Sequence, residues 1–235
     1  MKKQLGTLSL AALGLLITAG CANKMTDDRL NALEKRVEEL EKKPAMAARP
    51  EMPPAQEKAY QLPVGQSPVL GKKDAKVSIV VFSDGQCPFC KGADELLREA
   101  VKDPELKEKV NIVFKNYPLS FHQNAKPAAK AALAAKEQGD DKFWAMMEKI
   151  FNNQQNLTPE NFSKWAKEIG LSMPKYELAL KNNDGKYEEQ IKADMDLGTN
   201  QAQVRGTPSI YVGGWELRER SVQGIKNVLK EKNLI

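Results

Sequence analysis

A pair of cysteines at the boundary between two predicted elements constrains this sequence more than any other feature. Residues 77–82 form a continuous apolar run rich in β-branched side chains, which predicts a buried strand. Residues 91–101 have a helical pattern, and Cys87-Pro88-Phe89-Cys90 lies between the two segments. A second apolar run, residues 111–116, follows the helix. A strand, a helix and a strand of these lengths form a βαβ unit, so we expect an α/β fold in which these two strands are parallel.

The position of the two cysteines predicts their chemistry. Cys87 falls at the N-terminus of the helix, where unpaired N–H groups and the helix dipole favour a thiolate. Cys90 follows one turn later, close enough to form a disulfide with Cys87. Such a pair can be oxidised, reduced or exchanged with another protein, which indicates a thiol–disulfide exchange protein. We expect Cys87 to be the more exposed, nucleophilic thiol and Cys90 to be the buried thiol that resolves the mixed disulfide.

A metal site is the alternative use of these thiols. Zinc needs about four ligands, and the cysteine pair with one distant histidine, His122, does not supply them. Copper handling by a non-catalytic lipoprotein would use the pair as soft ligands. We favour the redox reading, in which the disulfide itself is the redox group and no cofactor or metal is needed.

The N-terminal segment, residues 1–20, resembles a lipoprotein signal peptide. A basic start precedes an apolar stretch, residues 5–17, that is short for a membrane span. Small residues directly before Cys21 resemble the bacterial lipobox, which implies lipidation of Cys21. An ordinary secretory signal is the alternative. Ala22 after the cysteine, by resemblance to enterobacterial lipoproteins, favours the outer membrane, with the protein facing the periplasm. With Cys21 lipidated, the chain has no structural disulfide framework, and its one remaining pair is free to be functional.

Residues 21–43 are predicted to form a lipid-anchored coiled-coil stalk. Apolar side chains recur there at a, d, a, d spacing between charged ones, namely Leu30, Leu33, Val37 and Leu40. Two tandem segments, 29–34 and 36–41, resemble the Arg-h-x-x-h-Glu motif of short trimeric coiled coils, in which h is an apolar residue. A homo-oligomeric stalk, with a trimer favoured, is one reading. A solvated helical spacer is the other, because two heptads are marginal as an isolated helix.

The rest of the chain divides by composition. Residues 44–68 are rich in proline and alanine, which predicts a semi-extended linker. Residues 69–235 are enough for one globular domain, with helical patterns over about 122–200 and a strand hairpin near Gly213-Gly214. The formal net charge of +5 comes from interleaved basic and acidic residues, which we interpret as solvated helix faces and not as a nucleic-acid surface.

The segment Phe-Ser-Asp-x-Gln-Cys-Pro-Phe-Cys, residues 82–90, resembles the DsbA-like disulfide oxidoreductases, as does Gly206-Thr207-Pro208. The resemblance covers about residue 60 to the C-terminus. It implies a thioredoxin fold with an inserted helical domain. It also implies that Pro208 is a cis-proline facing the cysteines and that the backbone of Thr207 pairs with an extended substrate. Pro88 and Phe89 are the further substrate-binding candidates.

Two positions depart from the family pattern. Phe89 replaces the histidine of the most oxidising relatives, so we expect a less extreme oxidant. Val81 stands where many relatives carry a buried acid that accepts a proton from the second thiol. Asp84, Glu95 and Lys115 are the candidates to replace that acid.

His122 and the apolar residues over 143–151 are interpreted as structural. His122 is interpreted as structural because it is not at the cysteine motif. An aromatic and methionine cluster over 143–151 is interpreted as core, with a substrate-binding patch as the alternative.

These features predict an envelope thiol–disulfide oxidoreductase that acts on exported proteins with cysteines and is recycled by a membrane redox partner. The stalk and Thr207, which resembles the corresponding residue of disulfide isomerases, favour an oligomeric isomerase. A monomeric DsbA-like oxidase or reductase is the alternative.

Overall fold

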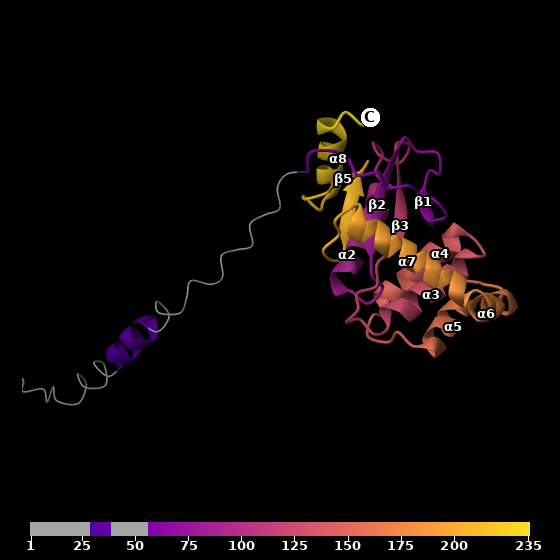
Figure 1. Cartoon of the computed structure of the whole chain (residues 1–235), viewed down its shortest axis with the longest axis horizontal. Coiled ribbons are helices and arrows are strands. Elements are labelled where there is room, and N and C mark those ends of the chain that lie inside the picture. Colours follow the sequence, from indigo (N-terminus) through magenta and orange to yellow (C-terminus); the bar gives the residue numbers. More distant parts are fainter. Residues whose placement is uncertain (1–28, 39–55) are drawn as a thin grey trace, which may run out of the picture. The chain divides into compact units, whose positions relative to one another are not determined.

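The computed structural model describes residues 29–38 and 56–235, which belong to two compact units, Met1–Ala55 and Gln56–Ile235 (Figure 1). In the first unit, residues 29–38 form a helix whose apolar side chains are exposed, with Leu30, Leu33 and Val37 each more than half accessible to solvent. The predicted signal peptide, Cys21, Leu40 and residues 44–55 lie outside the described residues. No helix in the described ranges has the length and apolar character needed to cross a membrane.

The second unit is built on a mixed five-stranded sheet with the strand order β1-β3-β2-β4-β5. Strands β2 and β3 are parallel and are joined by helix α2, as the sequence pattern predicts. Strands β4 and β5 form the predicted hairpin, and β4 pairs antiparallel with β2. The elements are β1 (Val69–Gly71), β2 (Val77–Ser83), α2 (Pro88–Ala100), β3 (Val110–Asn116), β4 (Ser209–Val212) and β5 (Trp215–Glu216).

A helical block is inserted between β3 and β4, close to the predicted range of 122–200. Its helices α3, α4, α5 and α6 lie together in Figure 1. Helix α8, after the hairpin, packs beside α2 and shares the larger core with α3 and α4. The block gives the domain the thioredoxin fold with the helical insertion expected from the sequence. The helices are α3 (Ala125–Lys136), α4 (Asp140–Asn152), α5 (Pro159–Glu168), α6 (Met173–Asn182), α7 (Asp184–Asn200) and α8 (Val222–Glu231).

The two faces of the sheet are covered differently because side chains alternate along β2. Val77, Ile79 and Val81 face the larger core, which also holds both cysteines and residues from α2, α3, α4 and α8. Val80 and Phe82 face a smaller core that contains Tyr211, with Leu197 of α7 packed against it. Both faces of the central strands are therefore buried, which explains their continuous apolar sequence.

The boundary predicted between linker and domain at residue 69 is wrong. The backbone N–H of Tyr60 donates to Gly214 O at 2.9 Å, and Gln56 binds the same hairpin. Tyr60, Leu62 and Val64 also pack against the smaller core. Because they alternate along an extended segment, their side chains point to the same side and pack on the sheet. The proline-rich composition of the segment gave no indication of this packing. The globular unit therefore begins at Gln56.

Both edges of the sheet are contacted by side chains from other segments. At β5, Gln56 accepts the N–H of Glu216 at 2.9 Å and donates to Gly214 O at 2.7 Å. At β1, the carboxylate of Asp140 accepts the N–H of Val69 at 3.1 Å. The edge strands thus have backbone groups that are bound by side chains.

The aromatic and methionine cluster of α4 is core, as predicted, and not a substrate patch. All of its large apolar side chains are at most 3% exposed. Phe114 of β3 makes edge-to-face contacts with Phe143 and Trp144, with ring centroids 5.1 and 5.7 Å apart. The cluster therefore attaches the helical block to the sheet.

Replacing Phe143 with alanine should reduce the free energy of unfolding by about 3–5 kcal/mol, because it removes a fully buried ring from a close-packed core. Urea unfolding followed by tryptophan fluorescence measures the effect. Phe121→Ala is the matched control, since that ring is 73% exposed and its loss should change stability by less than about 0.5 kcal/mol. Equal effects of the two substitutions would contradict this assignment of the core.

Candidate functional site

The two cysteines lie where β2 gives way to α2. Cys87 is the N-cap residue of α2, and Pro88 opens the helix with the fixed backbone angle that favours the first position. The N–H of Cys90 donates to Cys87 O at 3.1 Å, which closes the first turn. Both cysteines are free thiols. The strand-to-helix placement predicted from the sequence is therefore present.

Cys87 is the more exposed of the two thiols, as predicted, but the difference is small. Cys87 is only 3% exposed and Cys90 is fully buried. The cover over Cys87 includes the loop before β4, because its Sγ donates to Thr207 O at 3.3 Å. The side chain that protrudes from the motif is Phe89, which is 76% exposed.

The loop that faces Cys87 is the one anticipated from the family pattern. The Thr207–Pro208 peptide bond is cis. Arg220, from the segment before α8, donates to Pro208 O at 2.9 Å, and Ser209 Oγ donates to Gly206 O at 2.8 Å. These contacts fix the carbonyl groups on both sides of Thr207.

Burial raises the pKa of the Cys90 thiol from its ordinary value of 9.0 to about 12. Hydrogen bonding by the Ser83 side chain and the Asp84 backbone lowers that pKa by less, and a charge on Cys87 raises it further. The hydroxyl of Thr207 lies close enough to lower it slightly, although it makes no hydrogen bond of ordinary geometry. Cys90 is therefore protonated at neutral pH.

This shift predicts how the stability of the dithiol form depends on pH. Because the folded pKa of Cys90 lies above the unfolded one, the unfolded chain binds fewer protons above pH 9, and stability falls as the pH rises. The loss attributable to Cys90 should be about 1.4 kcal/mol per pH unit between pH 9 and pH 11. Denaturant unfolding of the reduced protein, beside a Cys90→Ala variant, measures the difference. Parallel pH profiles for the two proteins would contradict the shift.

The buried carboxylate of Asp84 organises the turn before Cys87. One oxygen accepts the N–H groups of Gln86 at 2.7 Å and Cys87 at 3.2 Å. The other accepts the N–H of Leu119 and the ring Nδ1 of His122, both at 2.8 Å. The side chain of Asp84 is fully buried. Of the candidates to replace the missing acid at Val81, Asp84 is the one beside the cysteines.

The other two candidates lie elsewhere. Glu95 is on the exposed side of α2, where it faces Lys91 at 4.0 Å. Lys115 forms a buried ion pair with Asp194 of α7 at 3.4 Å. Because Lys115 follows Phe114 on β3, it points to the face of the sheet opposite the cysteines. Neither residue is placed to exchange a proton with Cys90.

The sequence analysis placed neither His122 nor Gln154 in the site: it interpreted His122 as structural and did not consider Gln154. His122 does support structure, as interpreted, but it does so by binding Asp84, three residues before Cys87. Gln154, in the segment between α4 and α5, donates to Cys87 O at 2.7 Å and to Gly85 O at 3.1 Å. No periodicity or motif marks Gln154 in the sequence.

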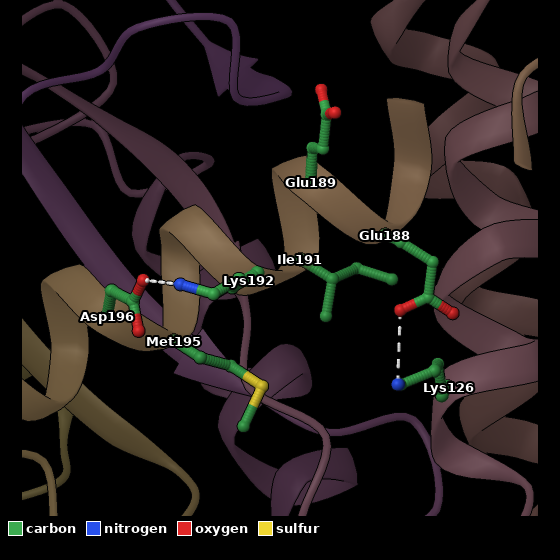
Figure 2. Close-up of a pocket in the computed structure, with 7 residues that line it drawn as sticks. All are labelled: Lys126, Glu188, Glu189, Ile191, Lys192, Met195 and Asp196. Atoms are coloured by element: carbon green, nitrogen blue, oxygen red, sulfur yellow. Dashed lines mark hydrogen bonds and ion pairs between the residues drawn. The ribbon is translucent and has the colours of Figure 1, made fainter. Parts of the chain in front are cut away.

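A shallow hollow of about 360 Å³ on α7 and α3 is separate from the cysteines. Figure 2 shows its charged side chains pairing with one another, Lys126 with Glu188 and Lys192 with Asp196. Its charged side chains pair with one another or face solvent, and its Ile191 is buried in the core, so we assign it no function. Within residues 29–38 and 56–235, no three potential metal-ligating acids, histidines or cysteines are grouped together.

Comparison with known proteins agrees with this geometry. Residues 64–231 match the family model described as Thioredoxin. The chain is 35% identical to disulfide bond formation protein D of Bacillus subtilis over 62% of its own length and 67% of that protein. It also superimposes on oxidised BdbD from Bacillus subtilis with a TM-score of 0.64 and 30% identity, covering 75% of this chain and 97% of BdbD.

A second kind of relative is much longer than this chain. The match to Na(+)/H(+) antiporter NhaA 3 of Salinispora tropica has 32% identity over 62% of this chain, and it spans only 21% of the antiporter. The chain thus corresponds to about a fifth of the first curated relatives that it matches.

Proposed function

The chain belongs to the DsbA-like thioredoxin-fold family, and we propose on that basis that it exchanges disulfides with exported proteins of the bacterial cell envelope. The observation that carries the proposal is Cys87 at the N-cap of α2, with its Sγ 3.3 Å from Thr207 O. A helix N-terminus favours the thiolate. A backbone carbonyl beside the thiol offers an extended client chain a place to pair. The disulfide itself supplies the redox chemistry, without a cofactor.

In this proposal Cys87 and Cys90 are the catalytic residues. In the oxidising direction, a client thiolate attacks Cys87 Sγ of the Cys87–Cys90 disulfide, and Cys90 leaves as a thiolate that takes up a proton. A second client thiolate then attacks the client sulfur of the mixed disulfide and releases Cys87. The client loses two electrons and gains a disulfide, and the protein becomes the dithiol.

We assign client contacts to the residues that surround Cys87. Phe89 presents an exposed ring that can cover apolar side chains of an unfolded client. Pro88 adjoins it in the motif, and Thr207 and Pro208 supply the backbone opposite. Sequence specificity is not required, because pairing with the Thr207 backbone is available to any extended chain.

An oligomeric disulfide isomerase is the more specific form of the proposal. Leu30, Leu33 and Val37 are exposed on the helix formed by residues 29–38, at the spacing of a coiled-coil seam. Copies of this helix would bury that row together, and a trimer is favoured by the repeated Arg-h-x-x-h-Glu pattern. During isomerisation the Cys87 thiolate attacks a wrong client disulfide and is later released, with no net change in electrons. A monomeric oxidase or reductase is the alternative.

The proposed location of the protein rests on its N-terminal sequence. We propose that lipidation of Cys21 holds the protein on the envelope facing the periplasm, with the outer membrane favoured. A membrane redox partner would then reset the cysteine pair after each turnover.

Two reactions of ribonuclease test these proposals. The mature chain from Cys21, made soluble by Cys21→Ser, should be compared with a chain that starts at Gln56, the first residue of the second compact unit. Oxidation of reduced ribonuclease by both chains is expected, and no reaction with either would overturn the exchange function. Reactivation of scrambled ribonuclease by the longer chain alone would support the oligomeric isomerase. Equal or absent reactivation would favour the monomeric oxidase or reductase.

A further inference from the structure

One side chain of the helical block binds the turn that carries Cys87 without taking part in the exchange steps above. Gln154 is 67 residues away from Cys87 in the sequence. Its amide nitrogen lies 2.7 Å from Cys87 O and 3.1 Å from Gly85 O, and it donates to both. Cys87 O also accepts the N–H of Cys90. The side-chain amide and the first helical hydrogen bond therefore converge on one oxygen.

The opposite side of the same turn is bound as well. Asp84 accepts the N–H groups of Gln86 and Cys87 through one carboxylate oxygen. The N–H of Cys87 is thus held by Asp84 and its carbonyl by Gln154. Asp84 belongs to the turn itself, whereas Gln154 is brought to it by α4, whose buried aromatic side chains pack on the sheet. The position of α4 therefore determines where the amide of Gln154 binds the backbone of Cys87.

The amide of Gln154 also has an electrostatic effect. It places the positive end of a dipole at the carbonyl of Cys87, beside the first turn of α2. Because the carbonyl and Cys90 N–H are hydrogen-bonded to each other, the same contact fixes the first turn of α2.

We propose that Gln154 is a positioning residue for Cys87, which holds the carbonyl side of the turn and raises the reactivity of the Cys87 thiol. The proposal deepens the exchange function and rests on it. It connects the helical insertion to the chemistry of the cysteine pair through a single amide.

Three variants of the full-length chain test the proposal, all carrying Cys21→Ser so that Cys87 and Cys90 are the only thiols. Gln154→Met keeps the length of the side chain and removes both donors. Gln154→Glu keeps the shape and places a carboxylate against two carbonyl oxygens. Gln155→Met is the matched control, since Gln155 is the exposed neighbour and no hydrogen bond involves its side chain within the described ranges. The measurements are the rate constant of Cys87 alkylation at pH 7, read by mass spectrometry, and the equilibrium with glutathione.

Gln154→Met should slow alkylation of Cys87 by about 3- to 10-fold, the range expected for loss of hydrogen bonds of ordinary strength. Gln154→Glu should slow it more, and both variants should shift the glutathione equilibrium away from the dithiol. Gln155→Met should remain within about twofold of the parent.

Rates and equilibria of all three variants within twofold of the parent would overturn the proposal. So would equal losses for Gln154→Met and Gln155→Met, or a lower melting temperature without a change in reactivity. If Gln154→Met does not fold, Gln154→Glu decides by the same two measurements. Alkylation and the glutathione equilibrium require no client protein. The proposal for Gln154 can therefore fail while the exchange function, tested with ribonuclease, stands. Loss of the exchange function would in turn show in the ribonuclease assay and not in these two measurements.

Discussion

Replacing Cys87 with serine should abolish disulfide exchange, and replacing Cys90 with serine should trap the protein on its clients. Without Cys87 Sγ there is no sulfur at the N-cap of α2 to form a mixed disulfide, and Cys90 is fully buried and held protonated by its raised pKa. We expect at least about a 10³-fold loss of activity with reduced ribonuclease, as for removal of other essential nucleophiles.

The Cys90→Ser variant retains the nucleophile and lacks the group that resolves the intermediate. Envelope extracts of cells that make this variant should contain client adducts that run as larger bands on non-reducing gels and disappear on reduction. Cells making Cys87→Ser are the control and should give no such bands. Adducts in the Cys87→Ser cells would show that Cys90 is the attacking thiol and would reverse the assigned roles.

Replacing Asp84 with alanine should destabilise the domain by about 3–5 kcal/mol. The change removes the acceptor of four donors, the N–H groups of Gln86, Cys87 and Leu119 and the ring of His122. Each buried donor left without a partner costs about 1–3 kcal/mol, with partial relief where water enters. Chemical unfolding of the reduced protein measures the loss. The reactivity of Cys87 should fall too, because its N–H then keeps only one acceptor, the backbone oxygen of residue 84 at 3.1 Å.

The control for Asp84 is Asp196→Ala. Asp196 is an exposed acid of α7 paired with Lys192 four residues earlier, and such pairs contribute at most about 0.5 kcal/mol. If Asp84→Ala lowers the free energy of unfolding no more than Asp196→Ala does, the carboxylate of Asp84 does not organise the turn.

Local sequence patterns predicted the elements that carry the cysteines. The apolar runs of β2 and β3 and the Cys-x-x-Cys between strand and helix are each contained within a few residues, so the βαβ unit could be read directly. The helical spacing of the aromatic residues in α4 likewise identified a buried face. Pro208 was placed by resemblance to a family, since its position opposite Cys87 depends on pairing between β4 and β2, which lie far apart in the sequence.

Contacts between distant polar residues could not be predicted in this way. His122 and Gln154 meet the turn across 38 and 67 residues, and neither belongs to a periodic pattern. The covering of Cys87 was missed for the same reason, because a helix N-terminus suggests exposure until the loop at Thr207 is placed over it. Residues 56–68 were read as linker because composition does not report that an extended segment can pair with a hairpin.

The bound edges of the sheet have a consequence for a protein that handles unfolded chains. An open edge strand offers its backbone to any extended segment, and clients of an exchange protein are rich in such segments. Here the side chain of Gln56 hydrogen-bonds to the backbone of the β4–β5 hairpin, and the carboxylate of Asp140 accepts the N–H of Val69 in β1. Strand addition at these two points is thereby disfavoured. In the proposed exchange function, the carbonyl of Thr207 is then the place at which a client backbone would dock. A client chain docked there, as proposed, would lie next to the Cys87 thiol, whose Sγ is 3.3 Å from Thr207 O.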